Sequence, residues 1–263
     1  KVPRALPDGQ NFLHQEEEFN LDWTVKIGKT NKRDGINAAA QMEEAIFAGG
    51  YIQNQDGVIN GYLVKLNEST GDLIWARSYP SDIKNKESAI EAVIRSADNA
   101  ILVAGVINAD KGTLEGFKSY GNPVSGVANI LYLSPEQLSS SEPPEQAIWE
   151  QQYNSLGSIR SVRSIDEGFV FVASKTEELY VVVRIDGAGN IIWQTELSNH
   201  GEATDITVVS KDDEVIGIAV SGHKSIDKGI DGSVTMLDLD GEILWNKNYG
   251  NPVGGINEYA GLD

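Results

Sequence analysis

Oxygen-bearing side chains gather in short glycine-containing loops of this sequence, and oxygen atoms are the ligands that Ca²⁺ takes in proteins. One loop, NQDGVIN, contains Asp56 and Asn60, and another, DKGIDG, contains Asp227 and Asp231. A near-copy of the second loop, DKGTLEG, begins at Asp110. None of these loops has the spacing of an EF-hand, and Asx turns in a solvated loop give the same composition. Two hypotheses therefore stand for the four residues, calcium ligation and a solvated turn, and calcium is the one cofactor that the sequence suggests.

The remaining reactive residue types show no catalytic spacing. The histidines His14, His200 and His223 are scattered, and the last two lie in turn-like text. The chain has no cysteine, which excludes disulfides, thiol nucleophiles, Cys-ligated zinc and iron–sulfur clusters. Neither a G-x-S-x-G elbow, a G-x-G-x-x-G motif nor a P-loop occurs. The sequence therefore assigns no catalytic and no cofactor-binding residue, and its glycosylation sequon, NES at Asn67, lies on a predicted hairpin tip.

A repeat centred on tryptophan indicates the elements that carry these loops. The copies TGDLIWARSY, AGNIIWQTEL and DGEILWNKNY are the clearest. The five copies are centred on Trp23, Trp75, Trp149, Trp193 and Trp245, at intervals of 52, 74, 44 and 52 residues. Three of these intervals are close to the roughly 40–50 residues of a four-stranded propeller blade, and the interval of 74 is enlarged by an insertion. Five copies of one catalytic site are implausible, so we interpret the tryptophans as structural residues.

Each copy has the pattern of a hairpin turn followed by an outer strand. In GDLIWARSY, Trp75, Arg77 and Tyr79 share one face at period two, and Gly71 precedes them in a turn. Further strands are predicted before each copy, such as SAIEAVIRS, AILVAGV and GYLVKL. INAAAQMEEAIFAGG has a helix-favouring composition, but the repeat predicts strands there too. The pattern predicts an all-β fold, a β-propeller of four-stranded antiparallel blades, with each tryptophan between adjacent blades.

The repeat divides the chain into an N-terminal extended segment, 1–20, and a β-propeller, 21–263. Four full blades are predicted at about 34–79, 88–153, 158–197 and 202–249, and 250–263 begins a further blade. The second blade contains an inserted loop, 116–147, which is partly polar and Pro-rich. Such loops carry binding specificity on many repeat scaffolds, and drift without function is the alternative. Because an open last blade exposes strand edges, we expect further sequence, another subunit or the segment 12–23 to close the ring.

The repeat resembles that of the secreted seven-bladed β-propeller, or delta-60 type, proteins. The residues that carry the resemblance are GYLVKLN from Gly61 to Asn67, Trp75, Tyr79, LVAG from Leu102 to Gly105, and YGNPVGGINEYA in the tail. This resemblance implies a secreted or surface-located propeller and is silent on activity. A second resemblance, of TGDLIW to quinoprotein-like propellers, implies a pyrroloquinoline-quinone dehydrogenase or an outer-membrane assembly scaffold. The vicinal Cys pair typical of those dehydrogenases is absent from this chain.

The charge balance limits the choice of partners. The chain has 21 Lys and Arg against 39 Asp and Glu, a formal net charge of -18. Nucleic-acid binding needs a basic stripe, and a membrane helix needs roughly 20 apolar residues in a row. We therefore expect neither a nucleic-acid partner nor membrane insertion. The first residue is Lys1, so a processed chain or a fragment is expected, in a secreted, cell-surface or periplasmic protein.

A repeat scaffold without a catalytic constellation predicts a non-enzymatic module. We expect it to bind a protein or a glycan, or to serve structural assembly with another subunit, in an extracytoplasmic or cell-surface protein. The alternative is a propeller enzyme, a quinoprotein-like oxidoreductase or a glycan-active enzyme, with its site in the central funnel. Acidic residues that converge at the channel would favour the enzyme, whereas small and apolar side chains there would favour the scaffold.

Overall fold

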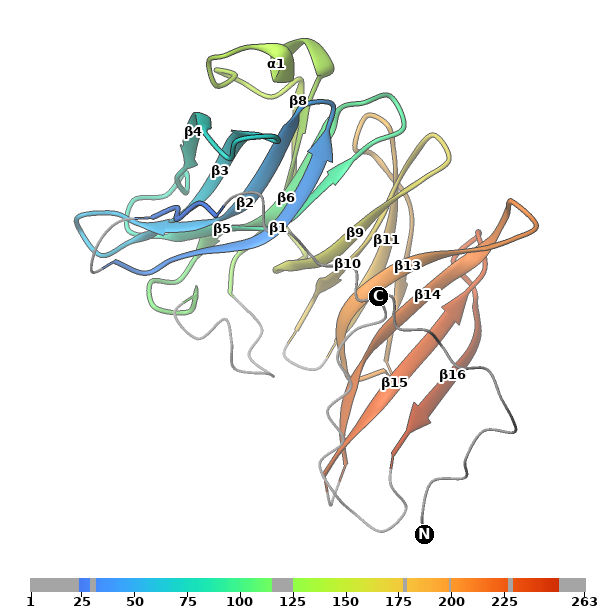
Figure 1. Cartoon of the computed structure of the whole chain (residues 1–263). Helices are drawn as coiled ribbons and strands as arrows, with labels where there is room; N and C mark the ends of the chain where they lie inside the picture. The colour runs from blue at the N-terminus through green and yellow to red at the C-terminus, as the bar shows by residue number, and fades with distance from the viewer. Residues whose placement is uncertain are drawn as a thin grey trace, which may run out of the picture.

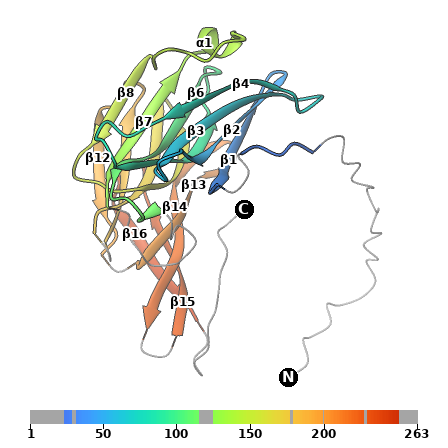
Figure 2. The ribbon, with the colours of Figure 1, turned by 90° about the vertical axis from the view of Figure 1, so that its left-hand side faces the viewer.

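The computed structural model describes residues 24–28, 32–114, 125–176, 179–198, 200–226 and 229–250. Within these residues the chain forms four antiparallel sheets of four strands each, and one short helix. In every sheet the strands lie in sequential order, and the sheets follow one another as propeller blades (Figures 1 and 2). The fold is therefore all-β and a β-propeller, as the repeat predicts.

The bounds of the strands follow the repeat. The first sheet consists of β1 (Asp34–Met42), β2 (Ala45–Gln53), β3 (Ile59–Asn67) and β4 (Leu73–Tyr79). The second consists of β5 (Glu87–Arg95), β6 (Ile101–Ala109), β7 (Val127–Leu133) and β8 (Trp149–Tyr153). The third consists of β9 (Ile159–Ile165), β10 (Gly168–Ser174), β11 (Tyr180–Asp186) and β12 (Ile191–Glu196). The fourth consists of β13 (Glu202–Lys211), β14 (Glu214–Ile226), β15 (Gly229–Leu237) and β16 (Ile243–Tyr249).

The turn before the outer strand is built around an aspartate in the third and fourth sheets. Asp186 Oδ1 accepts hydrogen bonds from the backbone N–H groups two and four residues later, at 2.9 and 2.8 Å. Asp238 Oδ1 repeats this arrangement at 3.0 and 2.8 Å. Gly189 and Gly241 then adopt φ angles of +85° and +86°, a conformation that favours glycine. The Asp-x-x-Gly motif of the repeat therefore specifies a tight hairpin at two equivalent places.

Apolar clusters join each sheet to the next. One cluster lies between the first and second sheets, one between the second and third, and one between the third and fourth. The central strand of the third sheet, β10, is buried along its whole length, as expected for a strand covered on both faces. The first strands of successive sheets also contact each other, β1 with β5, β5 with β9, and β9 with β13. The sheets thus stack side by side with their first strands in one row.

The region predicted as an inserted loop, 116–147, includes regular structure. It contains β7, the third strand of the second sheet, and helix α1 (Pro135–Ser139). A capping box between Ser134 and Gln137 starts this helix, and Leu138 is buried with 1% of its surface exposed. Between β7 and β8, where the third and fourth sheets have a tight hairpin, the polar, Pro-rich segment thus forms a short helix that covers the first sheet. No helix in the described part of the chain is long and apolar enough to cross a membrane.

Candidate functional site on the inner strands

A β-bulge lies at the equivalent place in the first strand of every sheet. The residues passed over by the ladder are Asn37 in β1, Glu91 in β5, Arg160 in β9 and Thr204 in β13. A bulge bends its strand and re-aims the side chain of the extra residue, and bulges are common beside functional sites. Because the four first strands are neighbours, the bulges mark one continuous candidate site.

The residue opposite each bulge must leave room for the bent strand. A Cβ atom on Gly105 would lie 2.0 Å from the carbonyl oxygen of Ala89, and one on Gly222 would lie 1.9 Å from that of Glu202. Glycine is therefore required sterically at these two positions. In the third sheet Ala173 takes the equivalent place. The Ala-Gly strand endings of the repeat are thus the partners of the bulges.

Side chains around the bulges form a polar row that runs across all four sheets. We call it the inner-strand polar chain and define it as Asn37, Glu91, Arg160, Glu202 and His223. Asn37 Nδ2 donates to Glu91 Oε1 at 3.2 Å. Arg160 Nη2 lies 3.4 Å from Glu202 Oε1, and His223 Nε2 lies 3.3 Å from Glu202 Oε2. Donors, acceptors and both signs of charge therefore alternate along one row.

The two carboxyl groups of the chain lie in different environments. Burial raises the pKa of Glu91 to about 8, and the nearby charge of Arg160 acts in the opposite direction. Glu202 is instead paired with both Arg160 and His223. Burial also raises the pKa of Tyr180, whose hydroxyl bonds with Arg160 and Glu202. Glu91 can therefore donate a hydrogen bond near neutral pH, while Glu202 accepts.

Two of the histidines that look scattered in the sequence lie near each other at the fourth sheet: His200, just before β13, and His223 in β14. His200 is buried, with 1% of its surface exposed, and its Nδ1 lies 2.8 Å from Thr235 Oγ1. Burial lowers the pKa of His200 to about 4, and the proximity of His223 contributes to this. His200 is therefore neutral at pH 7, beside the end of the polar chain. His14 lies outside the described residues.

A second charged pair lies next to the polar chain on the same strands. Arg163 Nη2 lies 3.0 and 3.2 Å from the two carboxylate oxygens of Asp205. Ser161 donates to the same carboxylate at 2.5 Å. These contacts join β9 to β13, and they hold the two inner strands in a fixed relation.

The predicted structural tryptophans occupy the seams between sheets. Trp149 Nε1 donates to the carbonyl oxygen of Gly187 at 3.0 Å, and Trp193 Nε1 donates to that of Leu239 at 3.0 Å. Both acceptors directly follow the aspartate of a hairpin turn in the next sheet. A Cβ on Gly189 would lie 3.0 Å from the Trp149 ring, and one on Gly241 2.7 Å from the Trp193 ring. Each ring thus rests on the turn glycine of the neighbouring blade.

Helix α1 replaces the hairpin turn in the seam between the first and second sheets. Trp75 is buried there with 4% of its surface exposed, but its indole N–H has no hydrogen-bond partner in the described structure. The strand beside it reaches the helix instead, since Lys65 Nζ donates to the carbonyl oxygens of Leu138 at 2.6 Å and Ser140 at 3.1 Å. Burial lowers the pKa of Lys65.

Trp245 differs from the other described tryptophans because 40% of its surface is exposed. All seven residues of β16 are exposed. No sheet of the described residues lies against β16, so the packing of Trp245 between blades stays a prediction. Trp23 lies outside the described residues.

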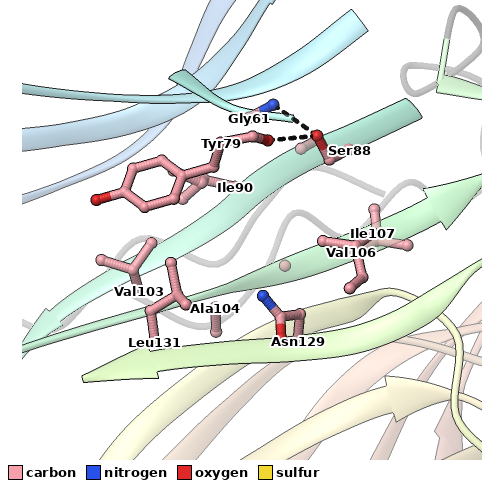
Figure 3. A pocket seen from close by; sticks show the side chains of 12 residues that line it. Gly61, Tyr79, Ser88, Ile90, Val103, Ala104, Val106, Ile107, Asn129 and Leu131 are labelled. Carbon is pink, nitrogen blue, oxygen red and sulfur yellow. Dashed lines mark hydrogen bonds between the residues drawn. The ribbon is translucent and has the colours of Figure 1, made fainter. Parts of the chain in front are cut away.

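A small cavity lies between the first two sheets (Figure 3). Ser88 lines one wall of the cavity and joins the two sheets there. Its Oγ donates to the carbonyl oxygen of Tyr79 at 2.6 Å and accepts from Gly61 N–H at 3.0 Å. Asn129 lines the opposite wall, and its Oδ1 has no partner among the described groups. The cavity volume of about 20 Å³ fits a water molecule but no organic substrate.

The calcium candidates are only partly placed by the structure. Asp56 is exposed in the β2–β3 turn, while Asn60 in β3 and Asp231 in β15 are half-buried. Asp227 lies outside the described residues. Within the described ranges, no group of three or more His, Asp or Glu side chains has a metal-binding arrangement. Asn54 Oδ1 accepts from two backbone N–H groups of the first loop at 2.9 Å, as in an Asx turn, and calcium binding there stays a prediction.

The glycosylation candidate takes part in its own turn. Asn67 ends β3, and its Oδ1 accepts hydrogen bonds from the N–H groups of Ser69 and Thr70 at 3.0 Å. Modification at Asn67 stays a prediction.

The inner-strand residues were not found by sequence motifs. Their signal in the sequence is indirect, because only the Ala-Gly endings of the second strands mark where a bulge must sit. A polar residue one position after an apolar residue in a first strand is otherwise common. The charge of Arg160 acts on Glu91 although the two residues are far apart in the chain, and no local pattern encodes this proximity.

The family model described as "Outer membrane protein assembly factor BamB" matches residues 137–258. A comparison with curated proteins finds no significant match. The match relates the second part of the chain to PQQ-like β-propeller repeats, and the resemblance to secreted seven-bladed repeats stays a prediction.

Several solved structures are similar to the chain. Sqt1 from Chaetomium thermophilum is 14% identical, with a TM-score of 0.46, over 80% of this chain and 44% of that one. The β-propeller domain of the trilobed protease from Pyrococcus furiosus is 15% identical, with a TM-score of 0.43, over 82% of this chain and 57% of that one. BamB from Moraxella catarrhalis is 14% identical, with a TM-score of 0.29, over 82% of this chain and 77% of that one. The chain thus spans about half the length of the first two.

Proposed function

We propose that this chain is a non-enzymatic β-propeller module of an extracytoplasmic protein, and that it binds a protein partner through the inner-strand polar chain. The observation that carries this proposal is the recurrence of one bulge per sheet at an equivalent position, from Asn37 to Thr204. Because the bulge lies at the same place in every first strand, the four bulge residues, which differ in type, lie along one row of neighbouring strands. The family match, to a protein named as an assembly factor, supports a role in assembly.

The chemistry of the polar chain suits a protein surface. Arg160 and Glu202 neutralise each other, which lowers the cost of removing them from water when a partner binds. Asn37 is exposed and offers an amide, and Glu91 offers a protonated carboxyl near neutral pH. Fixed donors and acceptors on rigid strands give a partner specificity and register.

The proposal is tested by capture from the extracytoplasmic fraction of the source organism, using the tagged full chain and a cross-linker. Glu91→Ala and Arg160→Ala should each lose the captured protein, because each removes one link of the polar chain. Glu150→Ala is the matched control, since Glu150 is an exposed carboxylate on outer strand β8. Circular dichroism confirms that each variant is folded. Equal capture by all three variants would show that the polar chain is not the binding site.

A second candidate function rests on the contrast between the two carboxyl groups. A protonated Glu91 and a paired Glu202 on either side of Arg160 form the kind of separated pair that general acid–base catalysis uses. Under this alternative the chain would be a glycan-active enzyme with Glu91 as proton donor. Hydrolysis of a glycan panel should then follow a pH profile that Glu91→Gln abolishes. Absence of turnover by the wild-type chain across the panel would leave the binding module as the function.

A further inference from the structure

Tyr180 lies behind the inner-strand polar chain and contacts two of its charged members. The residue begins β11 and exposes 1% of its surface, and it packs in the apolar cluster between the third and fourth sheets. Its hydroxyl bonds with the side chains of Arg160 and Glu202. These two side chains come from β9 and from the start of β13, and Arg160 Nη2 lies 3.4 Å from Glu202 Oε1. One buried hydroxyl therefore joins both members of an ion pair that links two sheets.

The chemistry of these three groups fixes the direction of both hydrogen bonds. A guanidinium has only donors, and an ionised carboxylate has only acceptors. The Tyr180 hydroxyl therefore accepts from Arg160 and donates its single proton to Glu202. Burial keeps that proton in place, because it raises the pKa of Tyr180 above that of an ordinary tyrosine. The three side chains thus form a closed set of hydrogen bonds, each of which is strengthened by a charge.

The repeated fold does not itself require a tyrosine at this position. In every sheet, the third-strand residue that pairs with the outer-strand tryptophan gives a common reference point. Tyr180 stands four residues before this reference in the third sheet, and the other three sheets have Gly61, Ala128 and Gly232 there. Those sheets form without a side-chain hydroxyl at this place. The third sheet differs from them because its bulge residue, Arg160, is the only cation among the four bulge residues.

We propose that Tyr180 is a positioning residue of the partner-binding site, and that its hydroxyl fixes Arg160 and Glu202 in the orientation that the protein partner recognises. A long side chain loses rotamer freedom when a partner immobilises it, and this loss weakens binding. Because Tyr180 holds the guanidinium beforehand, the partner does not have to order it. Tyr180 itself is buried and lies behind the pair. The inference rests on the proposed binding function and adds the residue that gives its ion pair a fixed geometry.

The first test uses the full chain alone, labelled with ¹⁵N, and compares Tyr180→Phe with Tyr153→Phe. Tyr153 is the matched control, because its buried hydroxyl also makes a hydrogen bond, but to the backbone carbonyl of Gly189 at 2.8 Å. The Nε–H resonance that disappears in Arg160→Lys identifies Arg160. In Tyr180→Phe this resonance should shift, and its exchange with water should speed up about tenfold, the factor that one hydrogen bond to a charged group supplies. An Arg160 resonance that moves equally little in both variants would overturn the inference.

The second test repeats the cross-linked capture of the partner with the same two variants, after circular dichroism has shown that both are folded. Tyr180→Phe should reduce the captured protein about fivefold, whereas Tyr153→Phe should capture as much as the wild type. Equal losses in the two variants would overturn the inference, because lost stability alone would then explain them. Full capture by Tyr180→Phe together with lost capture by Arg160→Ala would overturn the inference and leave the proposed function standing. Full capture by Arg160→Ala would instead overturn the proposed function itself.

Discussion

The seam between the third and fourth sheets predicts a stability difference between two chemically identical substitutions. Trp193→Ala removes a ring that rests on Gly241 and an indole N–H that donates to Leu239 at 3.0 Å. Trp245→Ala removes the same side chain from the equivalent position of β16, where it is exposed. Both residues sit in outer strands with similar text, so local propensity changes equally in the two variants.

The magnitude follows from burial and hydrogen bonding. Trp193 is half-buried, so loss of its ring costs about 1–2 kcal/mol of transfer free energy, and the lost hydrogen bond adds about 1 kcal/mol. The sum of about 2–3 kcal/mol lies just below the range of about 3–5 kcal/mol found for fully buried Trp→Ala changes. An exposed substitution such as Trp245→Ala typically changes stability by at most about 0.5 kcal/mol, and part of the Trp245 ring is still in contact, so we expect about 1 kcal/mol or less.

Urea unfolding at 25 °C, followed by far-UV circular dichroism, measures this difference without relying on tryptophan fluorescence. The unfolding midpoint should fall clearly for Trp193→Ala and little for Trp245→Ala. Trp193→Phe is the intermediate control, because it keeps one aromatic ring but loses the N–H donor and part of the ring area. Equal destabilisation by the two alanine variants would refute the argument that the next sheet, and not the strand itself, stabilises the tryptophan.

The remaining predictions concern protonation and calcium. Because the pKa of His200 is lowered to about 4, the unfolded chain binds a proton between pH 6.5 and 4 that the folded chain does not. The free energy of unfolding should therefore fall by up to about 3 kcal/mol as the pH falls through this window, and His200→Gln should flatten that slope. The effect of Glu91 on stability has the opposite sign, because its pKa is raised to about 8 and the folded chain holds the extra proton. Stability should thus fall as the pH rises from about 4.3 to 8, and Glu91→Gln should remove this loss. If the loop of Asp56 and Asn60 is a calcium site, chelator should lower the melting temperature and added Ca²⁺ should restore it.

A specific result would contradict each of these three predictions. Parallel pH profiles for wild type and His200→Gln between pH 4 and 6.5 would show that His200 titrates normally. Parallel pH profiles of stability for wild type and Glu91→Gln between pH 5 and 8 would likewise contradict the prediction for Glu91. Glu150→Gln, a change at an exposed carboxylate, is the control. For calcium, Asp56→Ala should abolish the response to added Ca²⁺. A melting temperature that is unchanged by chelator would leave these loops as solvated turns.

The amount that the sequence reveals depends on whether the interaction is local. The stretch INAAAQMEEAIFAGG has helix-forming composition, yet it forms β1 and β2 because the repeat supplies strand partners on both sides. The turns at Asp186 and Asp238 can also be predicted from the sequence, because hydrogen bonds between one side chain and backbone groups within four residues form them. Structure in the 116–147 region was missed in part, because no copy elsewhere in the chain shows the capping box of Ser134.

The sequence by itself determined the propeller, the four sheets found among the described residues, and the position of each described tryptophan in an outer strand. Periodicity of two residues and short turns are enough for that, because both act over a few positions. Only the tertiary structure decided that the charge of Arg160 acts on Glu91 and that Trp75 meets a helix instead of a turn. Both depend on which sheet packs next to which, and groups more than 40 residues apart in the chain come together only when the sheets stack.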